Sequence, residues 1–256
     1  MNLEQIAKLS GVSRSTVSRV INNDPNVSET TREKVRQVVR HFNYEPNAAA
    51  RGLAAGCTHV LGLVIPMGVS ALFTDPYFPI LIQGISSACN AHEYSVMLWL
   101  AEPEYERRQI RQIMHSGLID GVIVASTLTN DALVQALSEG DLPFVLIGRH
   151  PTNLHMSYVD ADNVSGTREA IRHLLRLGRK RIATITGPQD MIAGVDRLAG
   201  YTAALRERGI LPDENLIVGG GFNEMGGYVA MQQLLPRQPD AVFAASDMMA
   251  IGALRA

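Results

Sequence analysis

The segment SGVSRSTVSRVINN, residues 10–23, combines two arginines with four serines. An arginine side chain can donate two parallel hydrogen bonds to a guanine edge or bind a phosphate, and serine hydroxyls bind either group. By composition alone the segment could be a polar loop, a phosphorylation target or a surface helix. If its polar residues share one helix face, the chemistry that they offer is recognition of a nucleic acid.

The distribution of charge points the same way. Residues 1–56 carry eight Lys or Arg against five Asp or Glu, a net of +3, whereas residues 57–256 carry 15 against 20, a net of −5. These two parts sum to the net charge of −2 of the whole chain. A basic head on an acidic body indicates that the head alone binds a polyanion.

Apolar spacing predicts the elements that position these polar residues. A stripe of apolar residues predicts a first helix that ends at Gly11, and apolar residues from Val17 onward at i, i+3 and i+4 predict a second. A third helix is predicted over residues 28–44. Ala7, Gly11 and Val17 have the spacing of a helix-turn-helix, in which a small residue, a turn glycine and a β-branched plug bring two helices together.

This geometry selects the candidate DNA-binding residues. Arg14 and Ser15 begin the second helix and face away from its apolar plug, and Arg19 follows on the same face as the best candidate for a bidentate guanine contact. The hydroxyl groups placed to bind phosphates belong to Thr16, Ser18, Ser28, Thr31 and Tyr44. Each of these hydroxyl groups could instead cap a helix or be solvated.

From Val60 onward, apolar runs alternate with amphipathic stretches. Strands are predicted over residues 60–66, 94–100, 120–126, 143–148, 156–160, 181–187, 215–220 and 241–246. Helices are predicted near 79–92, 103–116, 130–139, 163–177, 195–208 and 223–235. This alternation favours parallel sheets with helices on both faces, and ligands of such sheets gather at the carboxyl ends of the strands.

Several classes of protein are disfavoured by the sequence. It holds no GxSxG, GxxxxGK[ST] or HExxH motif, and its seven histidines have no metal-ligand spacing, so we expect no enzyme activity, cofactor or metal. No apolar run approaches the roughly 20 residues of a membrane span. The N-terminus lacks a secretory signal and the cysteines Cys57 and Cys89 suit free thiols, which together favour a cytoplasmic protein.

The stretch IAKLSGVSRSTVSRVINNDPNVSETTREKV, followed by NYEPNAAARGLA, closely resembles the N-terminus of lactose and galactose repressor (LacI/GalR) family regulators. Further collinear segments resemble the family's core, including DPYFPILIQGI, DGVIVAS, VDADN, LGRKRIATITGP, DRLAGYTAAL and SDMMAIGALRA. The resemblance implies a small all-α helix-turn-helix head, a hinge helix and an α/β core of two parallel-sheet lobes, similar to periplasmic sugar-binding proteins.

The domain boundaries expected from this resemblance are residues 1–45 for the head, 46–57 for the hinge, and 58–256 for an effector-binding and dimerisation core. The core would divide into lobes at about 58–160 and 161–256. We also expect that the core is incomplete, because the chain stops at DMMAIGALRA, inside a helix just begun and before the last stretch of the family.

The resemblance also implies functional residues in the hinge and the core. In the hinge, Leu53 would wedge into the minor groove beside Asn47 and Ala50, although it could instead pack against the protein. The effector-binding residues implied are Asp75, Tyr77, Arg149, Arg197, Phe222 and Asp247. Two of them have structural alternatives, since Asp247 could cap a helix and Phe222 could belong to the core. Many relatives have an aspartate where this chain has Gly148, so Arg149 is the candidate that remains there.

The expected function is therefore a transcriptional regulator, most simply a repressor, controlled by a small molecule such as a sugar. A homodimer would bind a near-palindromic operator with two recognition helices. One alternative is the same architecture controlled by a protein partner or by no effector. A second is a sugar-binding protein with a vestigial head, which would show no sequence-specific DNA binding.

Overall fold

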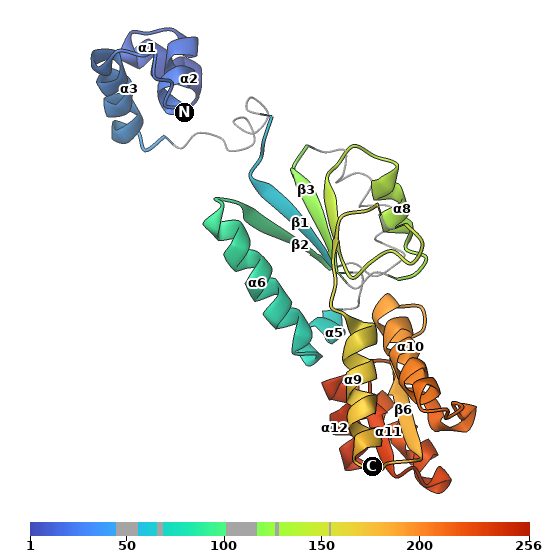
Figure 1. Cartoon of the computed structure of the whole chain (residues 1–256). Coiled ribbons are helices and arrows are strands. Elements are labelled where there is room, and N and C mark those ends of the chain that lie inside the picture. Colours follow the sequence, from blue (N-terminus) through green and yellow to red (C-terminus); the bar gives the residue numbers. More distant parts are fainter. Residues whose placement is uncertain (45–55, 66–68, 101–116, 126–127, 154) are drawn as a thin grey trace. The chain divides into compact units, whose positions relative to one another are not determined.

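The computed structural model describes residues 1–44, 56–65, 69–100, 117–125, 128–153 and 155–256. The chain divides into two compact units, Met1–Thr58 and His59–Ala256, which we call the head and the core (Figure 1). The helix predicted near 103–116 and the hinge residues Asn47, Ala50 and Leu53 lie outside the described residues.

Three helices form the described part of the head: α1 (Leu3–Ser10), α2 (Arg14–Ile21) and α3 (Glu29–His41). Asn2 caps α1 in a reciprocal capping box with Gln5. The turn to α2 passes through Gly11, whose φ of 67° lies in the left-handed region that glycine adopts without a steric penalty. Ser13 then caps α2 by accepting a hydrogen bond from the Thr16 N–H group. These local signals produce the predicted helix-turn-helix.

The head is held together by a small apolar core. Ile6, Val17 and Val35, one residue from each helix, have no exposed surface, and Ala7 and Val20 are also buried. Each such aliphatic side chain contributes about 1.5–3 kcal/mol by leaving water. Since Val17 and Val20 turn inward, the remaining faces of α2 are free to carry polar groups.

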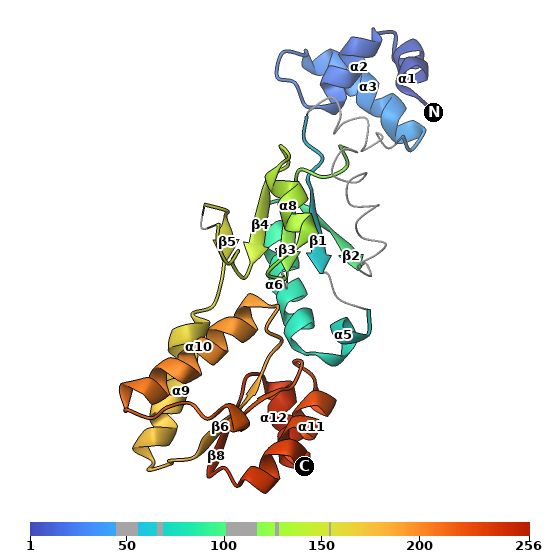
Figure 2. The same ribbon diagram turned by 90° about the vertical axis from the view of Figure 1, so that its right-hand side faces the viewer.

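The first sheet of the core has five parallel strands in the order β2-β1-β3-β4-β5. Their bounds are β1 (Val60–Ile65), β2 (Ser95–Leu100), β3 (Gly121–Ala125), β4 (Phe144–Ile147) and β5 (Tyr158–Val159). The accompanying helices are α5 (Val69–Thr74), α6 (Tyr77–Ala91) and α8 (Ala132–Ser138). Figure 2 shows β4, β3 and β1 side by side.

Helices cover both faces of this sheet because its strands are apolar on both sides. Leu63 and Ile65 of β1 pack with Phe78 of α6, whereas the intervening Val64 packs with Leu137 of α8. Alternation of side chains along β1 thus assigns one helix to each face.

The second sheet has three parallel strands in the order β7-β6-β8. Their bounds are β6 (Ile182–Thr186), β7 (Ile217–Gly219) and β8 (Ala241–Ala244). The helices of this part are α9 (Asn163–Arg176), α10 (Ile192–Glu207), α11 (Glu224–Leu234) and α12 (Asp247–Arg255), with short 3-10 turns at Glu214–Leu216 and Leu235–Arg237.

The two faces of β6 again receive different helices. Ile182 packs with Ile171 of α9 and Tyr201 of α10, while Ile185 packs with residues of α11 and α12. The Tyr201 hydroxyl is buried and donates to the Ile182 carbonyl oxygen at 2.8 Å. Burial raises the pKa of this tyrosine to about 12, so the phenol stays neutral and keeps that bond.

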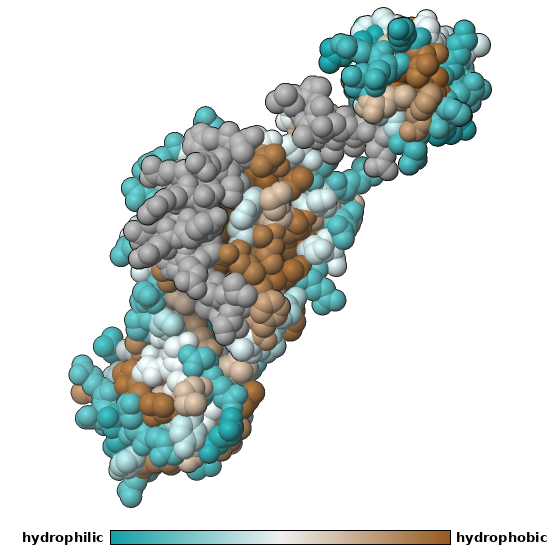
Figure 3. Space-filling view, turned by 180° about the vertical axis from the view of Figure 1, so that it is seen from behind, coloured by the Kyte–Doolittle hydropathy of each residue, from teal (hydrophilic) through white to brown (hydrophobic). Residues whose placement is uncertain are grey.

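The predicted fold class is confirmed, as an all-α head and an α/β core whose sheets are parallel. Among the described residues, no helix is long and apolar enough to cross a membrane. Figure 3 shows hydrophobic side chains gathered on one face of the core. In the first lobe, Ile80 of α6 and Met97 and Leu98 of β2 are exposed hydrophobic residues. Met97 and Leu98 are neighbours on β2, so their side chains point to opposite faces of the strand.

Candidate functional site

The exposed face of α2 carries the three predicted base-reading residues. Arg14, Ser15 and Arg19 are all exposed, and each arginine lies within ion-pairing distance of one acid. The distance is 3.9 Å from Arg14 to Glu4 and 3.8 Å from Arg19 to Asp24. At such distances and exposures these pairs are weak, so the guanidinium groups can exchange them for bases or phosphates.

The predicted phosphate-binding hydroxyls occupy the helix starts. Thr16 Oγ1 lies 2.8 Å from Ser13 Oγ, at the beginning of α2. Ser28 caps α3, and its hydroxyl lies 2.9 Å from Thr31 Oγ1. Ser28 is therefore a cap itself, while Thr16 and Thr31 pair with capping hydroxyls. All three lie at helix N-termini, which favour anions.

The other two hydroxyl-bearing candidates lie elsewhere. Ser18 is half-buried on α2, and Tyr44 follows α3 and is also half-buried. Tyr44 and Arg14 line one open hollow of the head together with Asn2, Leu3 and Glu4. The hollow brings the N-terminus of α1 and the start of α2 to one place, where the backbone N–H groups and Arg14 suit a phosphate.

In the core, Arg197 of α10 is the centre of a group of polar side chains. Its Nε donates to Asn163 Oδ1 at 2.8 Å, and its Nη1 donates to the Ala245 carbonyl oxygen at 2.5 Å. Asn163 begins α9 and Ala245 directly follows β8, so the guanidinium lies at the carboxyl ends of strands. Burial lowers the pKa of Arg197, and the charges of Tyr77, Asp160 and Asp247 oppose that effect.

Phe222 supplies an aromatic ring beside this guanidinium. The Arg197 Cζ atom lies 5.6 Å from the centroid of the ring, within the range of a cation–π contact. Phe222 has a φ of 57°, in the left-handed region that a bulky residue rarely adopts. The ring covers Gly187, where an added Cβ would lie 2.1 Å from the ring atom Cζ. Only glycine at the end of β6 therefore lets the ring lie there.

Arg149 is held by two carboxylates that the sequence did not single out. Its Nη2 lies 2.5 Å from Asp196 Oδ1 and its Nε lies 3.9 Å from Asp160 Oδ2. Asp196 is buried on α10, next to Arg197, and Asp160 directly follows β5. Asn163 joins the group, since its Nδ2 donates to Asp160 Oδ1 at 3.3 Å. Arg149 therefore links the carboxyl ends of β4 and β5 to α10.

Tyr77 and Asp75 lie at the start of α6. The Tyr77 N–H group donates to Asp75 Oδ1 at 3.0 Å, so Asp75 caps the chain there. Burial raises the pKa of the Tyr77 phenol, and the charge of Arg197 partly offsets this effect. Burial likewise raises the pKa of Asp160. These electrostatic couplings place Tyr77 and Asp160 near Arg197.

Asp247 is the exposed first residue of α12. The cap of that helix is Ser246, whose hydroxyl accepts from the Met249 N–H group at 3.3 Å, so the capping role considered for Asp247 belongs to its neighbour. Asp247 remains close enough to raise the pKa of Arg197. The two residues are therefore coupled electrostatically.

The core site thus gathers hydrogen-bond donors, acceptors and one aromatic ring at the carboxyl ends of two parallel sheets. Such a set binds polar, hydroxyl-rich molecules, whose C–H faces stack on the ring while their hydroxyls bond to the charged groups. In the described part of the chain, no three His, Cys, Asp or Glu side chains are grouped so as to hold a metal ion. The arrangement of these side chains therefore suits the binding of a polar, hydroxyl-rich ligand.

Comparison with known families identifies both units. Residues 2–47 match the family described as bacterial regulatory proteins, lacI family, and residues 58–256 match periplasmic binding proteins and sugar binding domain of LacI family. The chain belongs to the LacI family. It is accordingly a DNA-binding transcriptional regulator with a helix-turn-helix head and a periplasmic-binding-protein-like core.

Individual members of the LacI family resemble the chain along its whole length. The HTH-type transcriptional regulator CelR of Thermobifida fusca is 41% identical over 258 residues, covering 99% of this chain and 76% of CelR. The ribose operon repressor of Escherichia coli K12 is 34% identical, with coverage of 99% and 77%.

Solved structures of LacI-family regulators also resemble the fold of this chain. A CelR–cellobiose complex has a TM-score of 0.74 at 39% identity and covers 100% of this chain and 77% of that one. The lac repressor dimer bound to operator and the anti-inducer ONPF has a TM-score of 0.85 at 27% identity, with coverage of 100% and 76%.

Proposed function

We propose that this LacI-family regulator binds a neutral saccharide at the core site and that binding changes its affinity for an operator. The observation that carries the proposal is the Arg197–Phe222 pair, surrounded by Asn163, Asp160 and Asp247. A ring and a guanidinium with converging acceptors are the elements that a sugar requires. The saccharide held by CelR, a relative of 41% identity, supports the same class of ligand.

Charge favours a neutral ligand over a phosphorylated one. Among the residues that the structure describes, two arginines, Arg149 and Arg197, stand around the site against four aspartates, Asp75, Asp160, Asp196 and Asp247, a net of −2 for these six groups. Arg149 is already paired with carboxylates, and two N–H groups of Arg197 are used within the protein. A phosphate would have to displace these partners and approach a group of charges whose net sign is negative.

A ligand panel tests this proposal. Thermal denaturation of the full chain is measured with cellobiose, maltose and ribose, and in parallel with glucose 6-phosphate and a purine base. A neutral saccharide at 100 times its Kd is expected to stabilise the fold by about 2.7 kcal/mol. The phosphorylated sugar should give no shift. Stabilisation by the phosphate ester alone would contradict the neutral-ligand proposal.

Substitution of Gly187 tests more directly whether the Phe222 ring contacts the saccharide. Gly187→Ala places a methyl group where the Phe222 ring now lies, so the ring must move away from the site. We expect saccharide affinity to fall about tenfold, as expected for losing one well-placed aromatic contact. Isothermal titration calorimetry measures the change.

The matched control is Gly166→Ala on α9, where an added Cβ meets nothing within 4 Å. This variant should bind the saccharide like the wild type and gain roughly 0.5–1 kcal/mol of stability, as alanine does over glycine inside a helix. If both glycine variants bind the saccharide equally well, Phe222 does not contact the ligand.

On the DNA side, we propose that α2 lies in the major groove with Arg14, Ser15 and Arg19 toward base edges. The residues proposed to contact phosphates are Thr16, Ser18, Ser28, Thr31 and Tyr44. The exposure of the three base readers and the position of Thr16, Ser28 and Thr31 at helix starts support these roles. In the hinge we propose Leu53 as a minor-groove wedge beside Asn47 and Ala50.

We further propose a homodimer that binds a near-palindromic operator, acts in the cytoplasm and catalyses no reaction. Support comes from the exposed Ile80, Met97 and Leu98 of the first lobe, and from the dimeric lac repressor that the chain resembles. The proposed organisation is a head over 1–45, a hinge over 46–57 and a core over 58–256 with lobes meeting near residue 160.

A further inference from the structure

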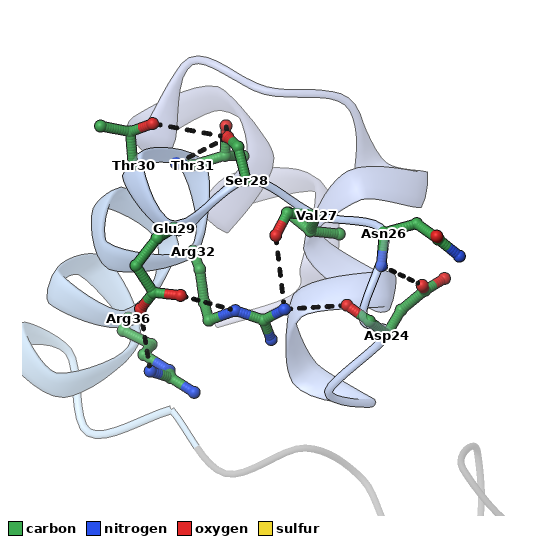
Figure 4. Close-up of polar contacts among 9 residues, drawn as sticks. All are labelled: Asp24, Asn26, Val27, Ser28, Glu29, Thr30, Thr31, Arg32 and Arg36. Carbon is green, nitrogen blue, oxygen red and sulfur yellow. Dashed lines mark hydrogen bonds and ion pairs between the residues drawn. The ribbon is translucent and has the colours of Figure 1, made fainter.

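The turn between α2 and α3 is built around the guanidinium of Arg32. Arg32 Nη2 donates to the Asp24 carbonyl oxygen at 2.8 Å and lies 3.4 Å from the Val27 carbonyl oxygen. Its Nε lies 3.4 Å from Glu29 Oε2, and only 11% of its side chain is exposed. Figure 4 shows this guanidinium reaching from α3 to the backbone of the turn. A buried charge with three acceptors fixes the position of Asp24.

Asp24 connects the turn to α2, the proposed recognition helix. Its Oδ1 accepts from the Asn26 N–H group at 2.9 Å, which fixes the orientation of the carboxylate (Figure 4). The other oxygen, Oδ2, lies 3.8 Å from Arg19 Nε. The Asp24 N–H group also donates to the Arg19 carbonyl oxygen at 2.9 Å. Arg19 thus meets Asp24 through both backbone and side chain.

This arrangement matters because an unrestrained arginine does not discriminate between targets. The Arg19 side chain is 65% exposed, and a free guanidinium binds any phosphate as readily as one base edge. A carboxylate at Nε restricts the plane of the guanidinium and leaves both terminal amino groups for a bidentate acceptor. Its negative charge also opposes contacts with neighbouring phosphates.

We propose that Asp24 is a positioning residue for Arg19, which lowers binding to non-specific DNA and sharpens discrimination at the base pair that Arg19 reads. The proposal rests on the proposed role of Arg19 as a base reader. Arg32 contributes by holding the turn. The contribution of Asp24 is to specificity, because the exposed ion pair adds little to stability.

The test is Asp24→Asn in the full chain, since an amide oxygen can still accept from Asn26 while the charge is lost. An operator is first selected from random duplexes by the wild-type chain. Fluorescence anisotropy then gives the Kd for this operator, for duplexes changed at single base pairs, and for non-specific DNA. The base pair at which Arg19→Ala loses discrimination identifies the contact of Arg19.

Asp24→Asn is expected to tighten non-specific binding severalfold and to reduce discrimination at that one base pair about fivefold or more. The same substitution in the Arg19→Ala background should leave discrimination unchanged. Glu33→Gln, an acid-to-amide change in the exposed Arg40 pair of α3, is the matched control and should not alter discrimination. A purely structural defect would weaken binding to every duplex alike.

Two results would overturn the inference, and they are distinguishable. If Arg19→Ala reveals a base pair but Asp24→Asn leaves discrimination there intact, Asp24 does not position Arg19 and the base-reading role stands. If Arg19→Ala weakens binding to all duplexes equally, the base-reading role fails and the inference falls with it.

Discussion

Replacing Arg197 with alanine is expected to weaken saccharide binding at least about a hundredfold, or roughly 2.7 kcal/mol. The substitution removes the guanidinium N–H groups that Asn163 and Ala245 do not use, which we propose donate to the saccharide, and the cation beside Phe222. Hydrogen bonds that involve a charged group each contribute about 1.5–3 kcal/mol, and the acceptors left behind lose their partner. Titration calorimetry with the saccharide that stabilises the wild type measures the loss.

Two variants separate this effect from a general loss of charge or structure. Arg206→Ala removes an exposed arginine from the same helix and should bind the saccharide normally. Arg197→Lys keeps the charge but not the planar fork, and it should lose most of the affinity. Saccharide affinity that survives in Arg197→Ala would remove this residue from the site.

Replacing Arg19 with alanine is expected to lower operator affinity about tenfold to a hundredfold, with most of the loss confined to one base pair. A bidentate contact between arginine and guanine contributes about 1–3 kcal/mol of discrimination against other bases. The side chain is exposed on α2, and its ion pair with Asp24 is weak, so its loss should leave the fold of the head intact. Anisotropy with the selected operator and its single-base variants measures both quantities.

Lys34→Ala is the matched control, because it removes one exposed positive charge of the head from α3. It should reduce binding to operator and to non-specific DNA by the same small factor. Equal losses on every duplex for Arg19→Ala would make that arginine a phosphate contact.

The fold could be predicted from the sequence because local signals agree with tertiary structure. The left-handed glycine at position 11 and the apolar Val17 and Val20 define the helix-turn-helix without any distant information. The eight predicted strands each contain an observed one, because each is a short apolar run between helical or turn segments. Helix α5 was not predicted, since six residues contain less than two turns of periodicity.

The core site could be predicted only in part. The resemblance indicated Arg197 and Phe222, but their environment depends on residues far apart in the chain. Asp160 and Asn163 were missed although Asp160 ends the predicted strand 156–160 and Asn163 follows it, where the strand-end rule could have found them. Asp196 gave no signal beyond its place next to Arg197, because its partner is 47 residues away.

A saccharide bound in the core is proposed to control the affinity of the head for DNA. The most direct measurement is the Kd of the selected operator, by anisotropy, with and without a saturating concentration of the saccharide that stabilises the wild type. We expect a shift of about tenfold or more in the wild type, in keeping with a coupling of roughly 1–3 kcal/mol, and no shift in Arg197→Ala. An unchanged operator Kd in the wild type, with the saccharide shown to be bound, would contradict it.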